Sequence, residues 1–495
     1  MRRLIPAGVF VLLIACALGD HYFRDEFYYL ACTRRMAWGY VDQPPLSVAL
    51  LWLIRHIAGD SLLVLRAAAA AIAALTVWTT GSIARRLGAG PFGEALAMTA
   101  VTVAPVLLAT ASFYSMNVID VFVWTAAARI LIDVVEAPTT GRWIALGVVL
   151  GLGLENKISV LWLGAGIGAA LILTPARRQL LTRGPWIAGA IAAAIFLPHV
   201  MWQITHGWPT LEFIANASRD KMQVTAPLAF VADQIQNMNP LLLPVWIAGL
   251  LFLLFRAGPR LRALAIVFLS VAAILIANRT SRSGYLAPAY PMLFAAGGVA
   301  LERLLVRRPF RVAAIAFVLV AGAISAPMAI PLLPVDRYVA YSRALGQAPS
   351  TEEKKAVGRL PQFFADRQGW EAMVDQIGAA FDRLSPADAR SAAVLVGNYG
   401  EAGAIELLGR SRGLTAISGH NNYWLWGPAD RAGDVLIVVS RSRERQEQRF
   451  TSVEQAGAIA CGDCMPYENG QFIFICRGMK PPPLPERWAQ FKHYE

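Results

Sequence analysis

About eleven apolar segments follow one another along the first two thirds of the chain, separated by short polar stretches. Several of them approach or exceed the roughly 18–20 residues that cross a hydrocarbon core as a helix. The chain is 56% hydrophobic and only 16% charged, whereas a soluble protein carries about a quarter charged residues. These features predict a polytopic α-helical membrane protein and argue against an ordinary soluble fold.

The expected spans follow from the positions of the apolar windows. Residues 20–60 form an external segment, in which Leu46–Ile54 predicts a short helix lying along the membrane surface. Arg2, Arg3 and the run ending at Ala15-Cys16-Ala17 resemble a signal peptide or a lipoprotein processing site, but the spans that follow favour an uncleaved first helix. The spans are expected near residues 4–19, 61–83, 92–111, 117–135, 142–154, 158–174, 185–203, 239–255, 263–277, 284–304 and 311–333.

The net charge of +12 is carried largely by arginines in short loops between the apolar segments. Loops rich in Lys and Arg remain in the cytoplasm, so this charge indicates topology and does not indicate a nucleic-acid partner. We expect the membrane to be the plasma (inner) membrane of a bacterium. Asp25, Asp120 and everything beyond residue 334 are then expected on its periplasmic side. The loops concerned carry Arg85, Arg86, Arg177, Arg178, Arg183, Arg256, Arg260, Arg262, Arg303, Arg307 and Arg308.

From about residue 335 the chain changes character. Charged runs appear, together with a helical pattern near 370–383 and short β-like runs at 392–397, 435–440 and 471–476. Alternating helices and strands are typical of an α/β domain. We therefore expect a transmembrane domain over residues 1–334 and a periplasmic α/β domain over 335–495.

Three cysteines, Cys461, Cys464 and Cys476, lie in this second part. An oxidising compartment favours one disulfide among them, and the sequence leaves the pair open. No histidine or second cysteine pair nearby completes a zinc-binding set.

Polar residues gather on the expected outer face, and each has a simpler structural explanation. Asp25 could pair with Arg24, Lys157 could extend to the headgroups, and Asp120 could cap its helix. Acids and bases that converge outside a helical bundle are nevertheless typical of a functional site. The candidates are Asp25, Glu26, Asp42, Tyr114, Asn117, Asp120, Lys157, Arg282 and Tyr285.

Such a set suits transfer of a group from a phosphate-linked lipid. A carboxylate can accept a proton from an acceptor hydroxyl as general base. Lysine and arginine can hold the lipid phosphate and stabilise the charge that develops on it as it leaves. The lipid tail would remain in the bilayer.

The motifs around these residues resemble the family 39 glycosyltransferases, the bacterial relatives of dolichyl-phosphate-mannose protein mannosyltransferases, which include the aminoarabinose transferases of lipid A. The resemblance covers nearly the whole chain. It is carried by Asp25-Glu26, Trp38-Gly-Tyr-Val-Asp-Gln-Pro-Pro-Leu46, Ser115-Met-Asn-Val-Ile-Asp120, Leu154-Glu-Asn-Lys-Ile-Ser159, His206-Gly-Trp-Pro-Thr-Leu-Glu-Phe213, Asn237-Met-Asn-Pro240, Phe364-Ala-Asp-Arg-Gln-Gly-Trp370, Asn398-Tyr-Gly-Glu-Ala-Gly-Ala-Ile405 and Ser418-Gly-His-Asn-Asn-Tyr-Trp-Leu-Trp426.

The resemblance implies a C-type glycosyltransferase fold, a polyprenyl-phosphate sugar donor, a lipid, glycan or protein acceptor, and inversion at the anomeric carbon. It implies that Asp25 is the catalytic base with Glu26 beside it, and that Asp120 supports the site or the acceptor. It also implies that Lys157, Arg282 and Tyr285 hold the donor phosphate. Metal use differs across the superfamily, so no cofactor is predicted and a divalent cation stays open.

Two regions of the second part have alternative interpretations. Glu401 and His420 carry polar side chains suited to acceptor recognition, whereas Gly400 and Gly403 are expected in a strand-to-helix turn. A flippase of lipid-linked saccharides and a membrane-anchored binding factor are the alternative functions. The chain shows no internal repeat of the kind common in transporters, and eleven spans exceed what an anchor needs. The sequence does not specify the sugar, the acceptor, the lipid length or the oligomeric state.

Overall fold

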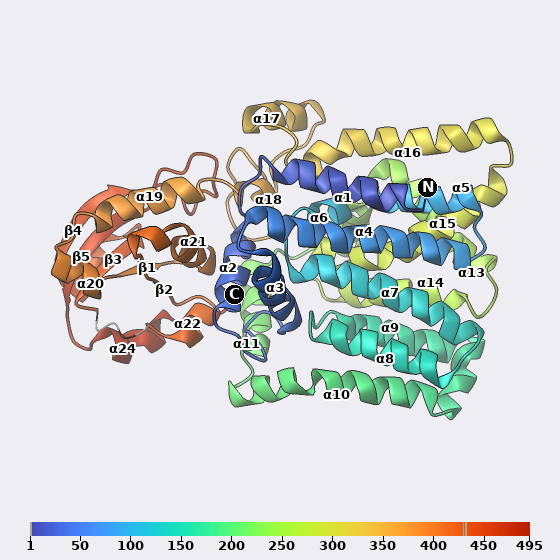
Figure 1. The fold of residues 1–495 in the computed structure, drawn as a ribbon, viewed down its shortest axis with the longest axis horizontal. Coiled ribbons are helices and arrows are strands. Elements are labelled where there is room, and N and C mark those ends of the chain that lie inside the picture. The colour runs from blue at the N-terminus through green and yellow to red at the C-terminus, as the bar shows by residue number, and fades with distance from the viewer. Residues whose placement is uncertain (1, 429, 431–432) are drawn as a thin grey trace. The chain divides into compact units, whose positions relative to one another are not determined.

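The computed structural model describes residues 2–428, 430 and 433–495, and it separates into two compact units that are described one at a time (Figure 1). The first, here called the helical unit, comprises residues 1–19, 43–205 and 224–334. The second, the sheet unit, comprises residues 20–42, 206–223 and 335–495. Whether residues 1–334 and 335–495 behave as separate domains stays a prediction.

The helical unit is a bundle of apolar helices. Within the described residues, four helices are long and apolar enough to cross a membrane, and seven do so if each of three bent pairs is one span. The protein is thus a multi-pass membrane protein, and the figure of eleven spans stays a prediction. Its main helices are α1 (Leu4–Ala17), α3 (Leu46–Ala58), α4 (Leu62–Arg86), α5 (Pro91–Val103), α6 (Pro105–Ala111), α7 (Met116–Glu136), α8 (Thr140–Leu154), α9 (Val160–Leu173), α10 (Gly184–Thr205), α12 (Pro227–Asn237), α13 (Leu243–Phe255), α14 (Arg262–Ala277), α15 (Tyr290–Leu304) and α16 (Arg308–Ala329).

Prolines account for the bent pairs. Pro105 follows Ala104, whose extended backbone ends α5, and α6 then leaves at 68°. A residue before proline is driven out of the helical region, so the chain bends where the sequence window had predicted one straight span. Prolines also begin η1 (Pro175–Leu181) and η3 (Pro240–Leu242), at the bends of 105° and 86°.

Helix pairs distant in sequence pack side by side within the bundle. Examples are α8 with α10, α13 with α15, and α9 with α14 (Figure 1). The surface helix expected at Leu46–Ile54 is helix α3, which buries Val48 and Leu51 and exposes Trp52.

The sheet unit is built on a five-stranded mixed sheet with the order β2-β1-β3-β5-β4. β1 pairs in parallel with β2 and β3, whereas β5 is antiparallel to β3 and β4. The strands are β1 (Ala393–Val396), β2 (Ala416–Ser418), β3 (Val435–Ser440), β4 (Phe450–Ala458) and β5 (Phe472–Met479). The helices are α2 (Arg24–Thr33), α11 (Pro209–Asn216), α17 (Val335–Ala344), α18 (Gln362–Ala365), α19 (Trp370–Phe381), α20 (Pro386–Ser391), α21 (Tyr399–Leu408), α22 (Asn422–Trp426), α23 (Arg443–Arg449) and α24 (Leu484–Arg487).

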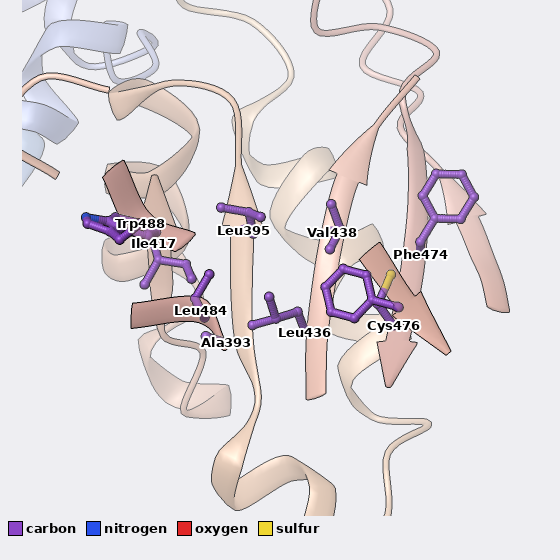
Figure 2. Close-up of a cluster of buried hydrophobic side chains, with 10 residues drawn as sticks. Ala393, Leu395, Ile417, Leu436, Val438, Phe474, Cys476, Leu484 and Trp488 are labelled. Carbon is purple, nitrogen blue, oxygen red and sulfur yellow. The ribbon is translucent and has the colours of Figure 1, made fainter. Parts of the chain in front are cut away.

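The core of this unit lies between the sheet and the segment around α24. Leu395, Leu436 and Phe474 from neighbouring strands belong to one buried cluster with Leu484 and Trp488, in which Leu484 and Trp488 lie beside Ile417 (Figure 2). Burying such side chains stabilises the fold by roughly 1.5–3 kcal/mol each. The disulfide that the sequence left open joins Cys461 and Cys464. Cys476 is a free cysteine in the hydrophobic core.

Candidate functional site

The first candidate cluster, here called the Lys157 cluster, lies in the helical unit at the start of α7. Ser115 caps this helix by accepting a hydrogen bond from the backbone N–H of Asn117 at 3.2 Å. Asp120 therefore does not supply the cap that its position allowed. Its side chain is 1% exposed and accepts a hydrogen bond from the Ser159 hydroxyl at 3.0 Å.

Lys157 is turned into the protein and does not extend outward to headgroups. Its Nζ donates a hydrogen bond to the Asn117 Oδ1 at 2.8 Å and lies 3.5 Å from the Asp120 carboxylate. The same ammonium lies 5.2 Å from the ring centroid of Tyr285, a cation–π distance. Only 14% of the Lys157 side chain is exposed, so it forms a largely enclosed cation whose ammonium is held by neighbouring side chains.

The turn that carries Lys157 is tied to its neighbours by main-chain contacts. Glu155 accepts a hydrogen bond through its carbonyl from the backbone N–H of Leu46 at 2.7 Å. Asn156 donates from its side chain to the carbonyl of Met116 at 2.8 Å. Tyr114, predicted to support the site, is buried and donates to the carbonyl of Ser47 at 2.7 Å. The turn, α3 and α7 are thus linked.

Tyr285 and Arg282 come from the short helix η4 (Ser283–Ala289), whose N-cap residue is Arg282. The carbonyl of Arg282 accepts a hydrogen bond from the backbone N–H of Tyr285 at 3.1 Å. The Tyr285 ring also contacts Trp162, with centroids 5.9 Å apart. Arg282, Tyr285 and Lys157 are all partly buried.

An apolar pocket begins one helical turn beyond the Lys157 cluster. Trp124 in this lining follows Asp120 by four residues, and Pro288 follows Tyr285 by three. Its walls offer dispersion contacts and few hydrogen-bonding groups, and the free space between them is about that of one water molecule. The pocket is lined by Trp124, Thr125, Ala128, Leu131, Leu163, Ile167, Leu264, Val267, Pro288, Ala289 and Met292.

The second candidate cluster, here called the Asp25 cluster, lies in the sheet unit and begins at α2. The sequence placed Asp25 and Glu26 in an external segment, and the structure places both in the first turn of a helix. Acids in a first turn favour the helix dipole. The Glu26 carboxylate is buried and accepts a hydrogen bond from the backbone N–H of Phe23 at 2.9 Å. Glu26 thus anchors the helix start.

Asp25 presents its carboxylate differently. Its side chain is 30% exposed, and its Oδ1 accepts a hydrogen bond from the Tyr399 hydroxyl at 2.8 Å. Arg24 Nε lies 3.6 Å from the same oxygen. Arg24 is itself held by the hydroxyl of Tyr467 at 2.9 Å and by Asp366 at 3.5 Å. Asp25 is therefore a partly accessible carboxylate beside a fixed cation.

Asp42 is held by a separate set of donors. Its Oδ1 accepts a hydrogen bond from Tyr28 at 3.0 Å, and its Oδ2 accepts one from the Asn421 side chain at 3.4 Å. Burial raises the pKa of Asp42 from 3.8 to about 6, against the opposing hydrogen bond from Tyr28. Asp25 and Asp42 thus belong to the same unit but are held by different donors.

Asp42→Asn is expected to change thermal stability in a pH-dependent way. The folded protein holds the Asp42 proton between about pH 4 and 6, where the unfolded chain has lost it, so folding is disfavoured as pH rises through this range. The rise in pKa corresponds to at most about 3 kcal/mol, since Asp42 is only partly buried. Relative to wild type, the variant should therefore be more stable at pH 7.5 than at pH 4.5. Melting of the detergent-purified protein at both pH values measures this; equal differences would contradict it.

Glu401 and His420, predicted for acceptor recognition, have internal partners. Glu401 accepts hydrogen bonds from the backbone N–H groups of Gly397 and Asn398 and from the Gln471 side chain, at 2.9, 3.2 and 3.0 Å. Burial lowers the pKa of His420 well below 6.5, which keeps its ring neutral. Its Nδ1 accepts from the backbone N–H of Tyr399 at 3.3 Å. A role of either residue in recognition stays a prediction.

Sequence reasoning missed several residues of the Asp25 cluster. Tyr399 was part of a quoted motif but had no role, and Tyr28, Asp366 and Tyr467 were not singled out. Lys221 was missed as well; it is buried, lies 3.8 Å from Glu353 and ends a π-helical turn, a feature frequent at functional sites. The aromatic run beside Asp25 was the available signal.

Metal binding was left open by the sequence. Among residues 2–428, 430 and 433–495, no group of three or more His, Cys, Asp or Glu side chains could hold a metal ion. Use of a divalent cation together with a phosphate-bearing substrate stays an open prediction.

Comparison with known proteins agrees with the motifs. The family model described as dolichyl-phosphate-mannose-protein mannosyltransferase matches residues 42–202. The lipid A galacturonosyltransferase RgtD of Rhizobium johnstonii is 26% identical over 228 residues, which are 45% of this chain and 47% of that protein. The chain thus matches about half the length of this relative.

Solved structures show the same fold. ArnT from Cupriavidus metallidurans bound to undecaprenyl phosphate superposes with a TM-score of 0.61 at 14% identity, over 95% of this chain and 97% of that one. The archaeal oligosaccharyltransferase AglB from Archaeoglobus fulgidus gives 0.50 at 12% identity, over 81% and 63%. The C-type glycosyltransferase fold and the resemblance to family 39 are confirmed.

Proposed function

We propose that this chain is an integral membrane glycosyltransferase that moves a sugar from a polyprenyl-phosphate-linked donor to a hydroxyl or phosphate of a lipid, glycan or protein acceptor. The observation that carries this proposal is the Lys157 cluster. A partly buried ammonium beside an aromatic ring, fixed by Asn117 and Asp120 at the end of an apolar helical bundle, has the chemistry of a lipid phosphate site. The family model, RgtD and ArnT support it.

In this proposal Lys157 holds the donor phosphate, and the chain's own contacts prepare it to do so. Asn117 and Asp120 fix the ammonium at 2.8 and 3.5 Å, so little side-chain entropy is lost on binding. Tyr285 flanks the cation, and Arg282 supplies a second positive charge from the same turn. Negative charge that develops on the leaving polyprenyl phosphate is stabilised by these groups.

Asp25 acts as the general base when the acceptor is a hydroxyl. Its carboxylate takes the hydroxyl proton while the acceptor oxygen forms a bond to the anomeric carbon. The bond from that carbon to the phosphate oxygen breaks on the opposite face, which inverts the configuration and releases polyprenyl phosphate. Asp25 is preferred over Glu26 because 30% of its side chain is exposed, whereas Glu26 is buried and caps α2.

Transfer is proposed on the periplasmic side of a bacterial inner membrane. The support is the arginine-rich character of alternate loops, which favours their retention in the cytoplasm. Cysteine labelling of single-cysteine variants in intact cells tests this orientation directly. A transmembrane domain over 1–334 and a C-terminal domain over 335–495 are proposed because charged runs and alternating helix and strand patterns begin near residue 335.

The decisive experiment compares cell-envelope lipids and glycans by mass spectrometry, with and without the chain. One envelope species is expected to lose one sugar mass when the chain is absent and to regain it on complementation. The purified protein in proteoliposomes should then transfer that sugar from its polyprenyl-phosphate donor. Translocation of a lipid-linked saccharide without covalent transfer would overturn the proposal in favour of a flippase.

A further inference from the structure

Two tyrosines of the sheet unit stack on each other, and each binds a different carboxylate. The rings of Tyr28 in α2 and Tyr399 in α21 have centroids 4.6 Å apart and an interplanar angle of 29°. The Tyr399 hydroxyl donates to Asp25 at 2.8 Å, and the Tyr28 hydroxyl donates to Asp42 at 3.0 Å. The stack therefore connects the two acids of the Asp25 cluster.

Close packing of α21 on α2 brings Tyr399 to Asp25. A Cβ atom added to Gly400 would lie 2.3 Å from Arg24 Cγ, and one added to Gly403 would lie 2.8 Å from the Phe27 backbone. Real Cβ atoms do not approach so closely, so only glycine allows this spacing. The two glycines expected in a turn lie in α21 against α2, and they set the distance between Tyr399 and Asp25.

Ring contacts and a backbone hydrogen bond fix the position of Tyr399. Its ring lies against Tyr28 and 4.7 Å from the ring of His420, and its backbone N–H donates to the same histidine. Asn398 and Glu401 form a capping box that fixes the start of α21. Burial raises the pKa of both tyrosines well above 10, so both hydroxyls keep their protons and remain donors.

The contacts to Asp25 are one-sided. The Tyr399 hydroxyl donates a hydrogen bond to Oδ1 at 2.8 Å, and Arg24 Nε lies 3.6 Å from the same oxygen. A carboxylate fixed through one oxygen presents the other in a constant direction, and a base must lie within about 2.6–3.2 Å of the proton that it takes. Misplacement of a reacting group by about 1 Å can lower a rate roughly a hundredfold.

We propose that Tyr399 is a positioning residue: its hydroxyl holds Oδ1 of Asp25 so that Oδ2 receives the acceptor proton. This inference rests on the proposed role of Asp25 as base. Tyr399 touches no substrate in this scheme and acts through the orientation of the carboxylate.

Tyr399→Phe tests the inference because it keeps the ring and the stack and removes the donor. Tyr423→Phe is the matched control, since the Tyr423 hydroxyl is buried in the same unit and has no hydrogen-bond partner among the residues that the structure describes. Each variant is purified in detergent as the full chain. Both should be folded, with melting temperatures close to wild type.

The first readout needs no substrate. A water-soluble carbodiimide is attacked by a carboxylate oxygen, and the hydrogen bond from Tyr399 occupies Oδ1 of Asp25 in the wild-type protein. Labelling at Asp25, followed by peptide mapping, is expected to be severalfold faster in Tyr399→Phe than in wild type and unchanged in Tyr423→Phe. Equal labelling of Asp25 in all three proteins would overturn the inference, whatever reaction the chain catalyses.

The second readout is kinetic, with the donor and acceptor pair found by mass spectrometry. Tyr399→Phe should lower kcat roughly 10- to 100-fold with KM for both substrates within twofold, because binding groups are unchanged. A wild-type kcat in Tyr399→Phe, or a loss that appears in KM and melting temperature, would overturn the inference. Full activity of Asp25→Asn would instead remove the proposed base, so the two failures are distinguishable.

Discussion

Asp25→Asn is expected to abolish sugar transfer while the protein still inserts and folds. Asparagine keeps the size of the side chain and still accepts the Tyr399 hydrogen bond, but it takes no proton from an acceptor hydroxyl. Loss of a general base lowers a rate typically 10²- to 10⁴-fold. Transfer in proteoliposomes and melting in detergent measure the two quantities separately.

The matched control for this prediction is Asp382→Asn, which removes an exposed carboxylate of the sheet unit next to the end of α19. It should transfer sugar at the wild-type rate. Glu26→Gln keeps an acceptor for the Phe23 N–H, so it should retain most of the activity. An active Asp25→Asn together with an inactive Glu26→Gln would exchange the roles assigned to the two acids.

Lys157→Met is expected to lower kcat/KM for transfer roughly 10²- to 10³-fold, the effect of losing one group that stabilises charge in a transition state. The substitution also leaves the Asp120 carboxylate buried without its cation, which is strongly destabilising. The single variant therefore combines two effects, and both melting temperature and activity should fall.

The double variant Lys157→Met, Asp120→Asn separates these effects. It removes both charges, so its melting temperature should return toward wild type. Its activity should stay low, because the proposed phosphate-binding cation is still missing. Recovery of transfer in the double variant would mean that Lys157 serves only to neutralise Asp120.

Apolar periodicity located the helices of the bundle well, because a window of apolar residues reports burial or lipid contact directly. It did not predict the bends at Pro105, Pro175 and Pro240, which depend on how each helix resumes after its proline. In the sheet unit, the runs at 392–397, 435–440 and 471–476 correspond to β1, β3 and β5.

Two strands were missed for different reasons. β2 has only three residues, too few for a pattern, and β4 is largely exposed on both faces. Strands without a buried face carry no alternation of polar and apolar residues. Their positions follow from pairing with β1 and β5, which is not a local property of the sequence.

In the candidate sites as well, some contacts were predictable from the sequence and others were not. Lys157, Asn117 and Asp120 come together as expected, since adjacent helices present them at neighbouring ends. The separation of roles between Asp25 and Glu26 was not predictable, because it depends on which carboxylate meets the Phe23 N–H and which meets Tyr399. The second contact joins residues 374 positions apart.

The long distance in sequence between Asp25 and Tyr399 has a consequence for biogenesis. Ribosomes add roughly 5–20 residues per second, so α21 is synthesised roughly 20–75 s after α2. During this interval α2 already carries Asp25 but lacks the glycine-lined helix on which it packs. A nascent chain released before residue 399 therefore has its proposed base without the tyrosine that orients it. The proposed base is therefore oriented only after nearly the whole of this sequence has been synthesised.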